Sequence, residues 1–521
     1  MATPSLPCAS CSPDGTSCQN IGKYSCANCR LVVYCGSECQ KAHWLIHKVD
    51  CKSPYTKKTW EAEWSVEGRT PTFMRDEDPV TFGGKKYLFG NVPALDILRL
   101  GANEGEAYGN QLRLLFAASG DLRNVVQTIT QLPPSYEPPI ENIMNDHEFD
   151  VVARKVTILL LALTADDRDE AVDCILHIWY SSFIRKSHFD ILKQRIRPLI
   201  QSVCEKTWTF KKRSVRLVLE KEAWDKLLSF MDVPDGLTID KANEVRKAVT
   251  LARSRFDHRD RHYLFLSPSH RVAKQRFRQD GLLLTLGARR SEHCEPNPTF
   301  FQSLDSWSMP DCADPLCGWS LHEVDKTPIG LATSYIYGKL FYYVRSMLEK
   351  FMYRMSKSTI AFQLLQVHAA IFLTILTSLL IASMYVFNIS DHGYLGAHRT
   401  VALVAPLLRA PPTNPHATLI TLFMSLIDEN FTLQDQTKEW TLGSLSTKRL
   451  ANYLLPTRPN RSIIDPALMK FAHARHHMRE YDDIFGRCAD KLQLARTRDW
   501  AGAVMKEEHT IIEKWPHRLK L

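Results

Sequence analysis

The chain has 521 residues, of which 45% are hydrophobic and 24% are charged. These fractions are typical of globular proteins and exclude wholesale disorder as well as collagen-like or coiled-coil repetition. The length predicts about two to four domains and ample chain for a large core. The 66 Lys and Arg residues against 57 Asp and Glu residues leave a net charge of +9, which is too mild over this length to require nucleic acid or anionic lipid as a partner.

Cysteine is concentrated at the amino-terminal end of the chain. Of the 14 cysteines, eight lie within the first 51 residues and the others are scattered. Residues 1–11 contain neither a basic n-region nor an apolar h-region, so we expect no secretory signal and a cytoplasmic or nuclear location. A cysteine cluster in such a chain is more typical of metal ligands than of disulfides.

The spacing within the cluster is suited to zinc. From Cys26 to Cys51 it reads C-x2-C-x5-C-x3-C-x7-H-x3-C, with His47 as the histidine. Zinc prefers four thiolate or imidazole ligands in a tetrahedron, and structural sites leave no position open. The C-x2-C pair turns two thiolates onto one ion, and C-x3-C and H-x3-C place two ligands one helical turn apart. Eight ligands therefore predict two zinc ions as the cofactor.

The residues between the ligands resemble the MYND-type zinc finger. The resemblance is carried by Tyr34-Cys35, Cys39-Gln40, His43-Trp44 and His47-Lys48 within CANCRLVVYCGSECQKAHWLIHKVDC. It implies a finger over residues 8–51 in which the ligand pairs interleave. One ion is then held by Cys26, Cys29, His47 and Cys51, and the other by Cys35, Cys39 and two upstream cysteines.

Two assignments are open for the upstream pair. The family usually begins with a short pair, which Cys8 and Cys11 supply, but it also has about seven residues before the next cysteine, which only Cys18 provides. Fungal relatives read C-A-N-L…C-x-N-x-G, which aligns with Cys8 and Cys18. We therefore favour a fungal-type finger with Cys8 and Cys18 as ligands and Cys11 as the alternative to Cys18.

The resemblance also implies protein partners, because MYND fingers bind short, often proline-containing peptides. A structural zinc site catalyses nothing, but it folds a segment that is too small to fold alone. We expect Trp44, Tyr34 and residues 31–33 to supply the peptide surface. A basic rim is formed by Lys41, Lys48, Lys52, Lys57 and Lys58. We expect this rim to be solvated rather than to bind nucleic acid, because no interleaved aromatic side chains accompany it.

Beyond the finger we expect a linker over residues 52–80 and a large α/β domain over residues 81–430. The linker is polar and contains three prolines. The domain opens with LRLLFAASGDLRNVVQTI, which predicts a buried strand at 112–117, a tight turn and an amphipathic helix. A second strand comes next, with an acidic turn at Asn145-Asp146 and a helix from Phe149. This order is typical of a Rossmann-like, nucleotide-binding unit.

Two further resemblances concern this domain. The blocks NVPALDIL, LLFAASGDLRNVVQTI, LFLSPSHRVAKQRFRQDGLLL and NISDHGYLG resemble the N-terminal domain of dynein axonemal assembly factors, a domain of unknown function. The strand, turn and helix also resemble the first motif of S-adenosylmethionine-dependent methyltransferases. That motif needs several glycines for close approach of the cofactor, and here only Gly120 is present. We therefore predict a degenerate domain without a bound cofactor, in which Gly120, Asp121 and Asp146 are the positions to test.

The rest of the chain is predicted to be mainly helical, with one late strand. A helical insertion is expected at about 165–350, a polar loop at 432–465 and C-terminal helices over 466–521, the last of them at 503–521. A short helix is expected at 94–100. A strand at 416–424 should join the same sheet as 112–117.

An uncharged run, AAIFLTILTSLLIASMYVF, covers residues 369–387. Its length is close to the about twenty residues of a membrane-spanning helix, and basic residues before it would place its start in the cytoplasm. Such a single-pass helix would separate the strand at 416–424 from its sheet, so a membrane partner is not favoured. The other interpretations are a buried element of the α/β domain, and a local frame error or mis-spliced boundary where relatives have a polar loop and a strand.

We interpret the chain as an adaptor whose finger recognises partner peptides and whose α/β domain supplies a second, non-catalytic surface. No G-x-S-x-G elbow, Walker loop or H-E-x-x-H motif is found, so we assign no catalytic residue. The alternatives are a divergent methyltransferase-like enzyme and a transcriptional co-regulator. MYND methyltransferases carry a SET domain, whose signature is not found in the sequence, and no cluster of five basic residues indicates nuclear import.

Overall fold

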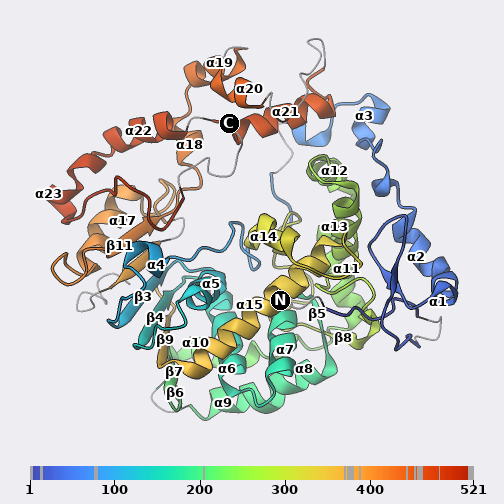
Figure 1. Cartoon of the computed structure of the whole chain (residues 1–521), viewed down its shortest axis with the longest axis horizontal. Coiled ribbons are helices and arrows are strands. Elements are labelled where there is room, and N and C mark those ends of the chain that lie inside the picture. Colours follow the sequence, from blue (N-terminus) through green and yellow to red (C-terminus); the bar gives the residue numbers. More distant parts are fainter. Residues whose placement is uncertain are drawn as a thin grey trace. The chain divides into compact units, whose positions relative to one another are not determined.

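The computed structural model describes residues 4–11, 16–75, 80–203, 206–368, 371, 381–386, 389–441, 444–450, 453, 462–479 and 481–513. The chain forms two compact units, each assembled from separate stretches of sequence (Figure 1). The first unit comprises residues 1–94, 153–205 and 220–354, and the second comprises 95–152, 206–219 and 355–521.

The second unit is built on a sheet that has seven strands within the described residues. The order is β11-β10-β3-β4-β9-β7-β6, and all neighbours are parallel except the β6–β7 hairpin at one edge. The strands are β3 (Leu112–Ala117), β4 (Ile140–Asn145), β6 (Thr207–Phe210), β7 (Arg213–Val218), β9 (Ile360–Leu365), β10 (Ser383–Val386) and β11 (Thr418–Thr421). The chain thus contains the large mixed α/β domain with a parallel sheet that the sequence predicts.

The central strands are buried on both faces, because consecutive residues of β3 and β4, which point to opposite sides of the sheet, are buried alike. An apolar run with little alternation is typical of such strands, and β3 has this pattern, whereas β4 also buries Asn142 and Asn145. Leu115, Ile143, Leu365 and Met384, from four neighbouring strands, form one core cluster with Val404. The strand predicted at 112–117 is confirmed, and the helix predicted from Phe149 is α6 (Phe149–Thr164).

The end of the uncharged run belongs to this sheet. Ile381 and Met384 are fully buried, and β10 lies between β3 and β11. The interpretation as a buried element therefore holds for residues 381–384, which a helix over 369–387 would have to include. The rest of the run, apart from Ile371, lies outside the described residues, and with it most of the segment to which the frame-error interpretation applies. In the part of the chain that the structure describes, no helix is both long and apolar enough to cross a membrane.

Short helices accompany the strands of the second unit. They are α4 (Leu100–Asn103), α5 (Arg123–Gln131), α17 (Ala397–Val404), α18 (Leu426–Asn430), α19 (Leu433–Trp440), α20 (Leu445–Leu450), α21 (Pro466–His476), α22 (Tyr481–Lys491) and α23 (Thr497–Ala501).

Three predictions made for the second unit are wrong. The helix expected at 94–100 begins only at Leu100, and residues 502–513 contain no helix where one was expected at 503–521. The loop expected at 432–465 contains α19 and α20. A capping box between Thr432 and Asp435 starts α19, so a short local signal outweighs the polar composition.

The strand predicted at 416–424 joins the expected sheet as β11. Its direct neighbour there is β10, which lies between β11 and β3.

The first unit is mostly helical and includes the amino-terminal finger. Its helices are α1 (Ser37–Ala42), α2 (Trp44–Cys51), α3 (Glu63–Glu67), α7 (Arg168–Tyr180), α8 (Lys186–Ile191), α9 (Arg197–Gln201), α10 (Lys221–Ser229), α11 (Ile239–Thr250), α12 (Phe256–Tyr263), α13 (Pro268–Asp280), α14 (Leu321–Lys326) and α15 (Ile336–Lys357). Two antiparallel pairs join them, β1 (Tyr24–Ser25) with β2 (Val33–Tyr34), and β5 (Phe183–Arg185) with β8 (His293–Pro296).

The helical insertion expected at about 165–350 is interrupted by the hairpin of β6 and β7, which joins the sheet of the second unit. Val215 and Leu217 are buried while Arg216 between them is exposed, so this segment has the alternation of a strand and not the period of a helix.

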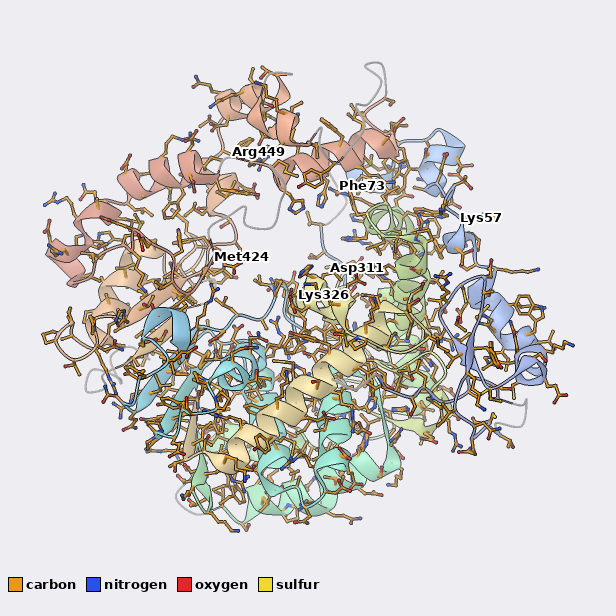
Figure 2. All side chains as sticks on the ribbon, viewed as in Figure 1. Lys57, Phe73, Asp311, Lys326, Met424 and Arg449 are labelled. Carbon is orange, nitrogen blue, oxygen red and sulfur yellow. The ribbon has the colours of Figure 1, made fainter. Side chains whose placement is uncertain are left out.

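The segment predicted to be a linker is instead packed against α12 and α13 over its described part, residues 52–75. Trp64 is fully buried and meets Phe73 edge to face, with 5.3 Å between ring centroids. Phe73 is labelled in Figure 2. Tyr55 meets Tyr263 of α12 in the same way at 5.0 Å. The polar composition is misleading because a few large aromatic side chains supply the buried area that fixes the segment.

Asp257 of α12 binds residues 52–75 through hydrogen bonds and an ion pair. Its buried carboxylate accepts hydrogen bonds from two nitrogens of Arg69, at 2.6 and 2.8 Å, and from the backbone N–H of Thr72 at 2.7 Å. Burial alone would raise the pKa of Asp257, but these hydrogen bonds hold it below the ordinary value. The ionised carboxylate is therefore the form that the fold stabilises.

We expect Asp257→Asn to lower the free energy of unfolding by about 1–3 kcal/mol at neutral pH, because charged hydrogen bonds to a buried group are lost. Since the folded-state pKa of Asp257 is depressed, its contribution is present at neutral pH and is lost as the pH falls through that value. Urea unfolding at decreasing pH should show the difference from wild type shrinking. Glu67→Gln, which removes an exposed partner of the same arginine, is the matched control and should change stability by less than about 0.5 kcal/mol.

Candidate metal centre

The finger has too little regular structure to be stable by itself. Its strands β1 and β2 are two residues each, and its helices α1 and α2 span six and eight residues. Isolated elements of this length are marginal in water. The elements instead serve to place ligands, because α1 carries Cys39, α2 carries His47 and Cys51, and Cys26 and Cys35 directly follow the two strands.

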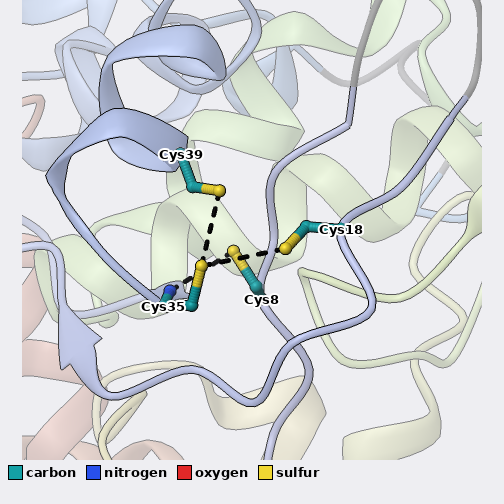
Figure 3. Close-up of side chains that lie close together, drawn as sticks. All are labelled: Cys8, Cys18, Cys35 and Cys39. Carbon is teal, nitrogen blue, oxygen red and sulfur yellow. Dashed lines mark hydrogen bonds between the residues drawn. The ribbon is translucent and has the colours of Figure 1, made fainter.

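One group of four side chains consists of Cys8, Cys18, Cys35 and Cys39 (Figure 3). The ligand atoms all lie within 4.8 Å of one another. The Sγ atom of Cys35 is 3.7 Å from that of Cys18 and 3.4 Å from that of Cys39. Cys11 belongs to neither group of the finger. Of the two upstream assignments left open by the sequence, the geometry therefore favours Cys8 with Cys18.

The second group consists of Cys26, Cys29, His47 and Cys51. The Sγ atoms of Cys26 and Cys51 are 3.8 Å apart, and Sγ of Cys29 is 3.4 Å from Nε2 of His47. The pairs interleave along the chain, because Cys35 and Cys39 of the first group lie between Cys29 and His47 of the second. The structure thus gathers the eight expected side chains into the two expected sets.

These spacings fit zinc and do not fit disulfides. Four sulfurs at about 2.3 Å from a tetrahedral zinc ion lie about 3.8 Å from one another, which is close to the distances in both groups. A disulfide requires sulfurs at about 2.05 Å. Each group has four ligands, so neither leaves a coordination position open for a substrate. The finger, with two complete Cys and His groups, fits two zinc ions.

The electrostatics of the ligands also favour a cation. Burial lowers the pKa of His47 to about 4, so its imidazole is neutral and available as a ligand at physiological pH. Contact with the neighbouring Cys35 thiol raises the pKa of Cys39 to about 12, and burial raises that of Cys29 as well. Thiols gathered this closely cannot all lose their protons unless a divalent cation offsets the charge.

Hydrogen-bond donors around the ligands were missed by sequence reasoning. The side-chain amide of Asn28 donates to Sγ of Cys51 at 3.2 Å, and the backbone N–H of Leu31 donates to Sγ of Cys29 at 3.4 Å. In the first group, the backbone N–H of Cys35 donates to Sγ of Cys8 at 3.4 Å. Such donors orient thiolates and stabilise their charge. The asparagine between Cys26 and Cys29 is the one signal in the sequence that pointed to this role.

The apolar surface expected to bind peptides is covered by the chain itself. Leu31, Val32, Val33 and Tyr34 are all buried. A seam between the finger and the rest of the first unit, here called the finger seam, is lined by Leu6, Leu31, Val33, Leu286, Ile329 and Ala332. The prediction that Tyr34 and residues 31–33 supply the peptide surface is therefore wrong, because their side chains are buried within the same unit, and Trp44 of the same prediction is half-buried.

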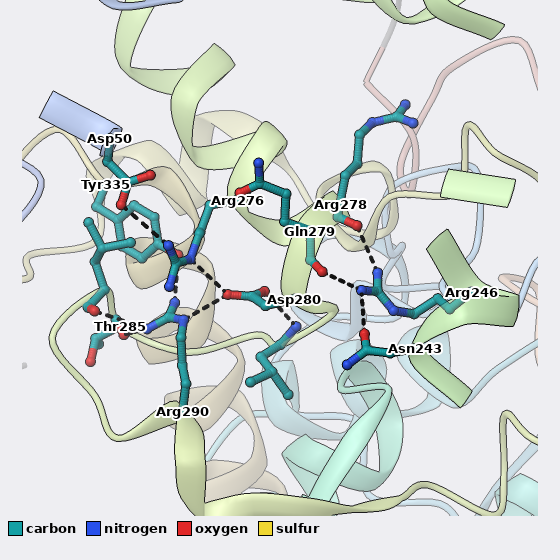
Figure 4. Close-up of polar contacts among 12 residues, drawn as sticks. Asp50, Asn243, Arg246, Arg276, Arg278, Gln279, Asp280, Thr285, Arg290 and Tyr335 are labelled. Carbon is teal, nitrogen blue, oxygen red and sulfur yellow. Dashed lines mark hydrogen bonds and ion pairs between the residues drawn. The ribbon is translucent and has the colours of Figure 1, made fainter. Parts of the chain in front are cut away.

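An ion-pair chain fastens the finger to the first unit beside this seam (Figure 4). Asp50 of α2 lies 3.6 Å from Arg276 of α13, and Arg276 in turn pairs with Asp280 at 3.1 Å. Asp280 also pairs with Arg290 at 2.7 Å, whose guanidinium donates to the backbone carbonyl of Leu286 at 2.9 Å. The charges of this chain alternate in sign, so it holds α2 in place without leaving a buried charge uncompensated.

The scattered cysteines and the positions named for a cofactor lie outside the finger. Cys174 and Cys488 are buried thiols, and Cys204 lies outside the described residues. Outside the finger, the described residues contain no other group of three or more Cys, His, Asp or Glu side chains close enough to share a metal ion. Gly120 and Asp146, two of the three positions named for a cofactor, lie together in the second unit, where Oδ2 of Asp146 accepts a hydrogen bond from the Gly120 N–H at 2.8 Å.

Comparison with known proteins identifies two regions of the chain. The family model described as MYND finger matches residues 8–51, and the model described as a domain of unknown function, DUF4470, matches residues 88–184. The chain is also similar to histone-lysine N-methyltransferase SMYD3 of Mus musculus, with 31% identity over 114 residues, which are 22% of this chain and 26% of that relative. The chain thus spans about a quarter of the length of that relative. No solved structure matches the chain.

The protein is therefore one with an amino-terminal MYND finger, suited to two zinc ions, followed by a large mixed α/β domain with a parallel sheet. MYND fingers are generally protein-interaction modules, which supports an interaction role for the finger. The DUF4470 match begins within the first unit, crosses the second and ends within the first, so it does not coincide with either compact unit.

We expect the purified full-length chain to contain two zinc ions, and Cys18→Ser to contain one, because three ligands bind zinc far less tightly than a closed set of four. Metal content can be measured by mass spectrometry after extensive dialysis. Cys11→Ser is the matched control, because it removes a thiol of the same finger that belongs to neither group, and it should retain both ions. If Cys11→Ser loses an ion and Cys18→Ser keeps both, Cys11 is the ligand.

Proposed function

We propose that this protein is a zinc-dependent interaction or adaptor protein whose finger presents a surface to partner proteins. In this proposal one ion is held by Cys8, Cys18, Cys35 and Cys39, and the other by Cys26, Cys29, His47 and Cys51. The observation that carries the proposal is the completeness of both groups. With four protein ligands each, the ions have a structural role. The finger then provides a binding surface but no open coordination position for catalysis.

We further propose that the α/β domain is a Rossmann-like scaffold that binds no nucleotide cofactor. Its support is the loop after β3, at the carboxyl end of the sheet where such folds hold ligands. The Asp146 carboxylate, which in a nucleotide-binding domain contacts a ribose, accepts from the Gly120 N–H at 2.8 Å. Asp121 pairs with Arg123 at 2.7 Å. The polar groups of this loop are therefore occupied by interactions with neighbouring residues of the protein.

The fungal type of the finger and the relation of residues 81–430 to dynein axonemal assembly factors stay predictions. They are consistent with a role in assembling larger complexes, which an adaptor would fill. The recognition of short peptides by the finger is likewise part of the proposal.

A second candidate is a methyltransferase-like activity. The observation that favours it is the similarity to histone-lysine N-methyltransferase SMYD3, although the shared stretch covers only 26% of that protein. The loop after β3 is the observation against a methyltransferase-like activity, because a cofactor would have to displace the hydrogen bond between Asp146 and Gly120.

The proposal predicts that partner binding depends on the zinc site. Affinity purification with the wild-type chain and with Cys35→Ala/Cys39→Ala should identify proteins that are retained only by the wild type, because loss of two ligands unfolds the finger. Cys11→Ser is the matched control and should retain the same proteins. An identical set of proteins from all three chains would contradict the role of the finger.

The scaffold proposal predicts no binding of S-adenosylmethionine. Titration calorimetry with the full-length chain should give no heat of binding at ligand concentrations up to about 1 mM, which corresponds to a binding free energy weaker than about −4 kcal/mol. Micromolar binding that is abolished by Asp146→Ala would instead support the methyltransferase-like candidate. Asp166→Ala, at an exposed carboxylate outside this loop, is the control for nonspecific effects.

A further inference from the structure

The helix α2 has its apolar side chains on the face opposite the zinc ligands. Its inner face carries His47 and Cys51, both buried in the second metal group. Leu45 and Val49, four residues apart, lie on one outward face, and their exposed fractions are 71% and 63%. Ile46 beside them is 44% exposed. An amphipathic helix normally turns its apolar stripe inward, so metal ligation has reversed the usual orientation.

The exposed face of α2 differs from the apolar surface of the finger that the chain itself buries. Leu31, Val32 and Val33 are buried in the finger seam, and Tyr34 is buried in the cluster that contains the ligand cysteines. The fold therefore sequesters one apolar face of the finger and leaves another in contact with water. Large apolar side chains gathered in a short exposed stretch are typical of interaction sites rather than of an ordinary surface.

Lysines accompany the exposed face. Lys48 lies one turn from Leu45, and Lys52 follows Val49 by three residues and places its Nζ 5.6 Å from the ring centroid of Trp44. Within the described residues, no carboxylate lies in ion-pair distance of Lys48 or Lys52, since the acidic residue of this helix, Asp50, points to Arg276. The face therefore has a positive potential beside its apolar side chains.

We propose that the outer face of α2, formed by Leu45, Ile46, Val49, Lys48 and Lys52, docks an acidic segment of a partner protein that carries large apolar side chains. This proposal rests on the interaction role of the finger proposed above and names the surface and the chemistry of the partner. Apolar side chains of the segment cover Leu45 and Val49, and its carboxylates lie against the two lysines.

Charge also decides against a second copy of the chain as the occupant. A symmetric dimer would bring the same patch of both copies together, so that lysine would face lysine. Like charges at close range oppose association, whereas a partner of opposite charge gains both attraction and faster encounter. An acidic, apolar partner segment is therefore the occupant that this face fits.

The test is selection of a library of random linear peptides displayed on phage against the full-length chain. We expect the enriched peptides to be acidic and to contain several Leu, Ile, Phe or Trp residues. A synthetic peptide of the enriched sequence should bind the wild-type chain, and its Kd should rise about tenfold in Leu45→Ser/Val49→Ser and in Lys48→Glu/Lys52→Glu. Zinc content is measured for each variant, so that loss of the fold is recognised.

Ile21→Ser/Tyr24→Ser is the matched control. It removes two exposed apolar side chains of the same finger that lie outside α2, and it should leave the Kd unchanged. Loss of binding in this control, with retention in the α2 variants, would place the partner elsewhere on the finger and overturn the inference. Enrichment of uncharged or basic peptides, or no enrichment, would also overturn it.

Two further outcomes distinguish other occupants. If the wild-type chain sediments as a dimer that Leu45→Ser/Val49→Ser dissociates, the face is an interface between copies and the inference is wrong. The other occupant to distinguish from a peptide is a DNA duplex. If the wild type binds a DNA duplex, Lys48→Glu/Lys52→Glu does not, and no acidic peptide competes, then the two lysines bind nucleic acid and the inference is wrong. The proposed adaptor role fails separately, when Cys35→Ala/Cys39→Ala retains every protein partner of the wild type.

Discussion

The coordination of metal by thiolate and imidazole is the interaction on which the amino-terminal structure depends. In its described residues, the finger has two strands of two residues and two short helices, which bury too little apolar surface to fold by themselves. Two closed sets of four ligands replace the missing core, because the free energy of binding zinc is released only when the ligands are brought together. The orientation of α2 follows from the same constraint, since His47 and Cys51 must face inward.

The finger is joined to the helices behind it by contacts of a different kind. Apolar side chains fill the finger seam, and the alternating charges of Asp50, Arg276, Asp280 and Arg290 run beside it. Asp50 is the neighbour of the ligand Cys51, so the metal site and the ion-pair chain share the end of α2. The finger is thus a built-in part of the first unit, and the surface it offers to partners is what this packing leaves exposed.

The second unit combines a mainly parallel sheet with a loop after β3 whose polar groups bond to one another. Parallel strands buried on both faces explain the apolar sequences of β3 and β10, including the end of the uncharged run. At the carboxyl end of β3, however, the polar groups of the loop satisfy one another. Sheet topology is set by the hydrophobic pattern of the strands, whereas ligand binding depends on a few polar atoms at their ends, so the two can be lost or kept independently.

The sequence by itself predicted the finger, all but one of the side chains that its two groups of four bring together, the strand at 112–117 and the parallel α/β character of the large domain, because spacing and local periodicity carry this information. The choice between Cys11 and Cys18 stayed open. The sequence also did not determine which apolar residues of the finger are exposed, that Tyr55 and Trp64 fix a polar segment, or that β6 and β7 leave the helical region to join the sheet. These features depend on pairings between residues far apart in the chain. Which side chains are buried and which charges pair depends on which distant segments come into contact. Only the tertiary structure decides those contacts.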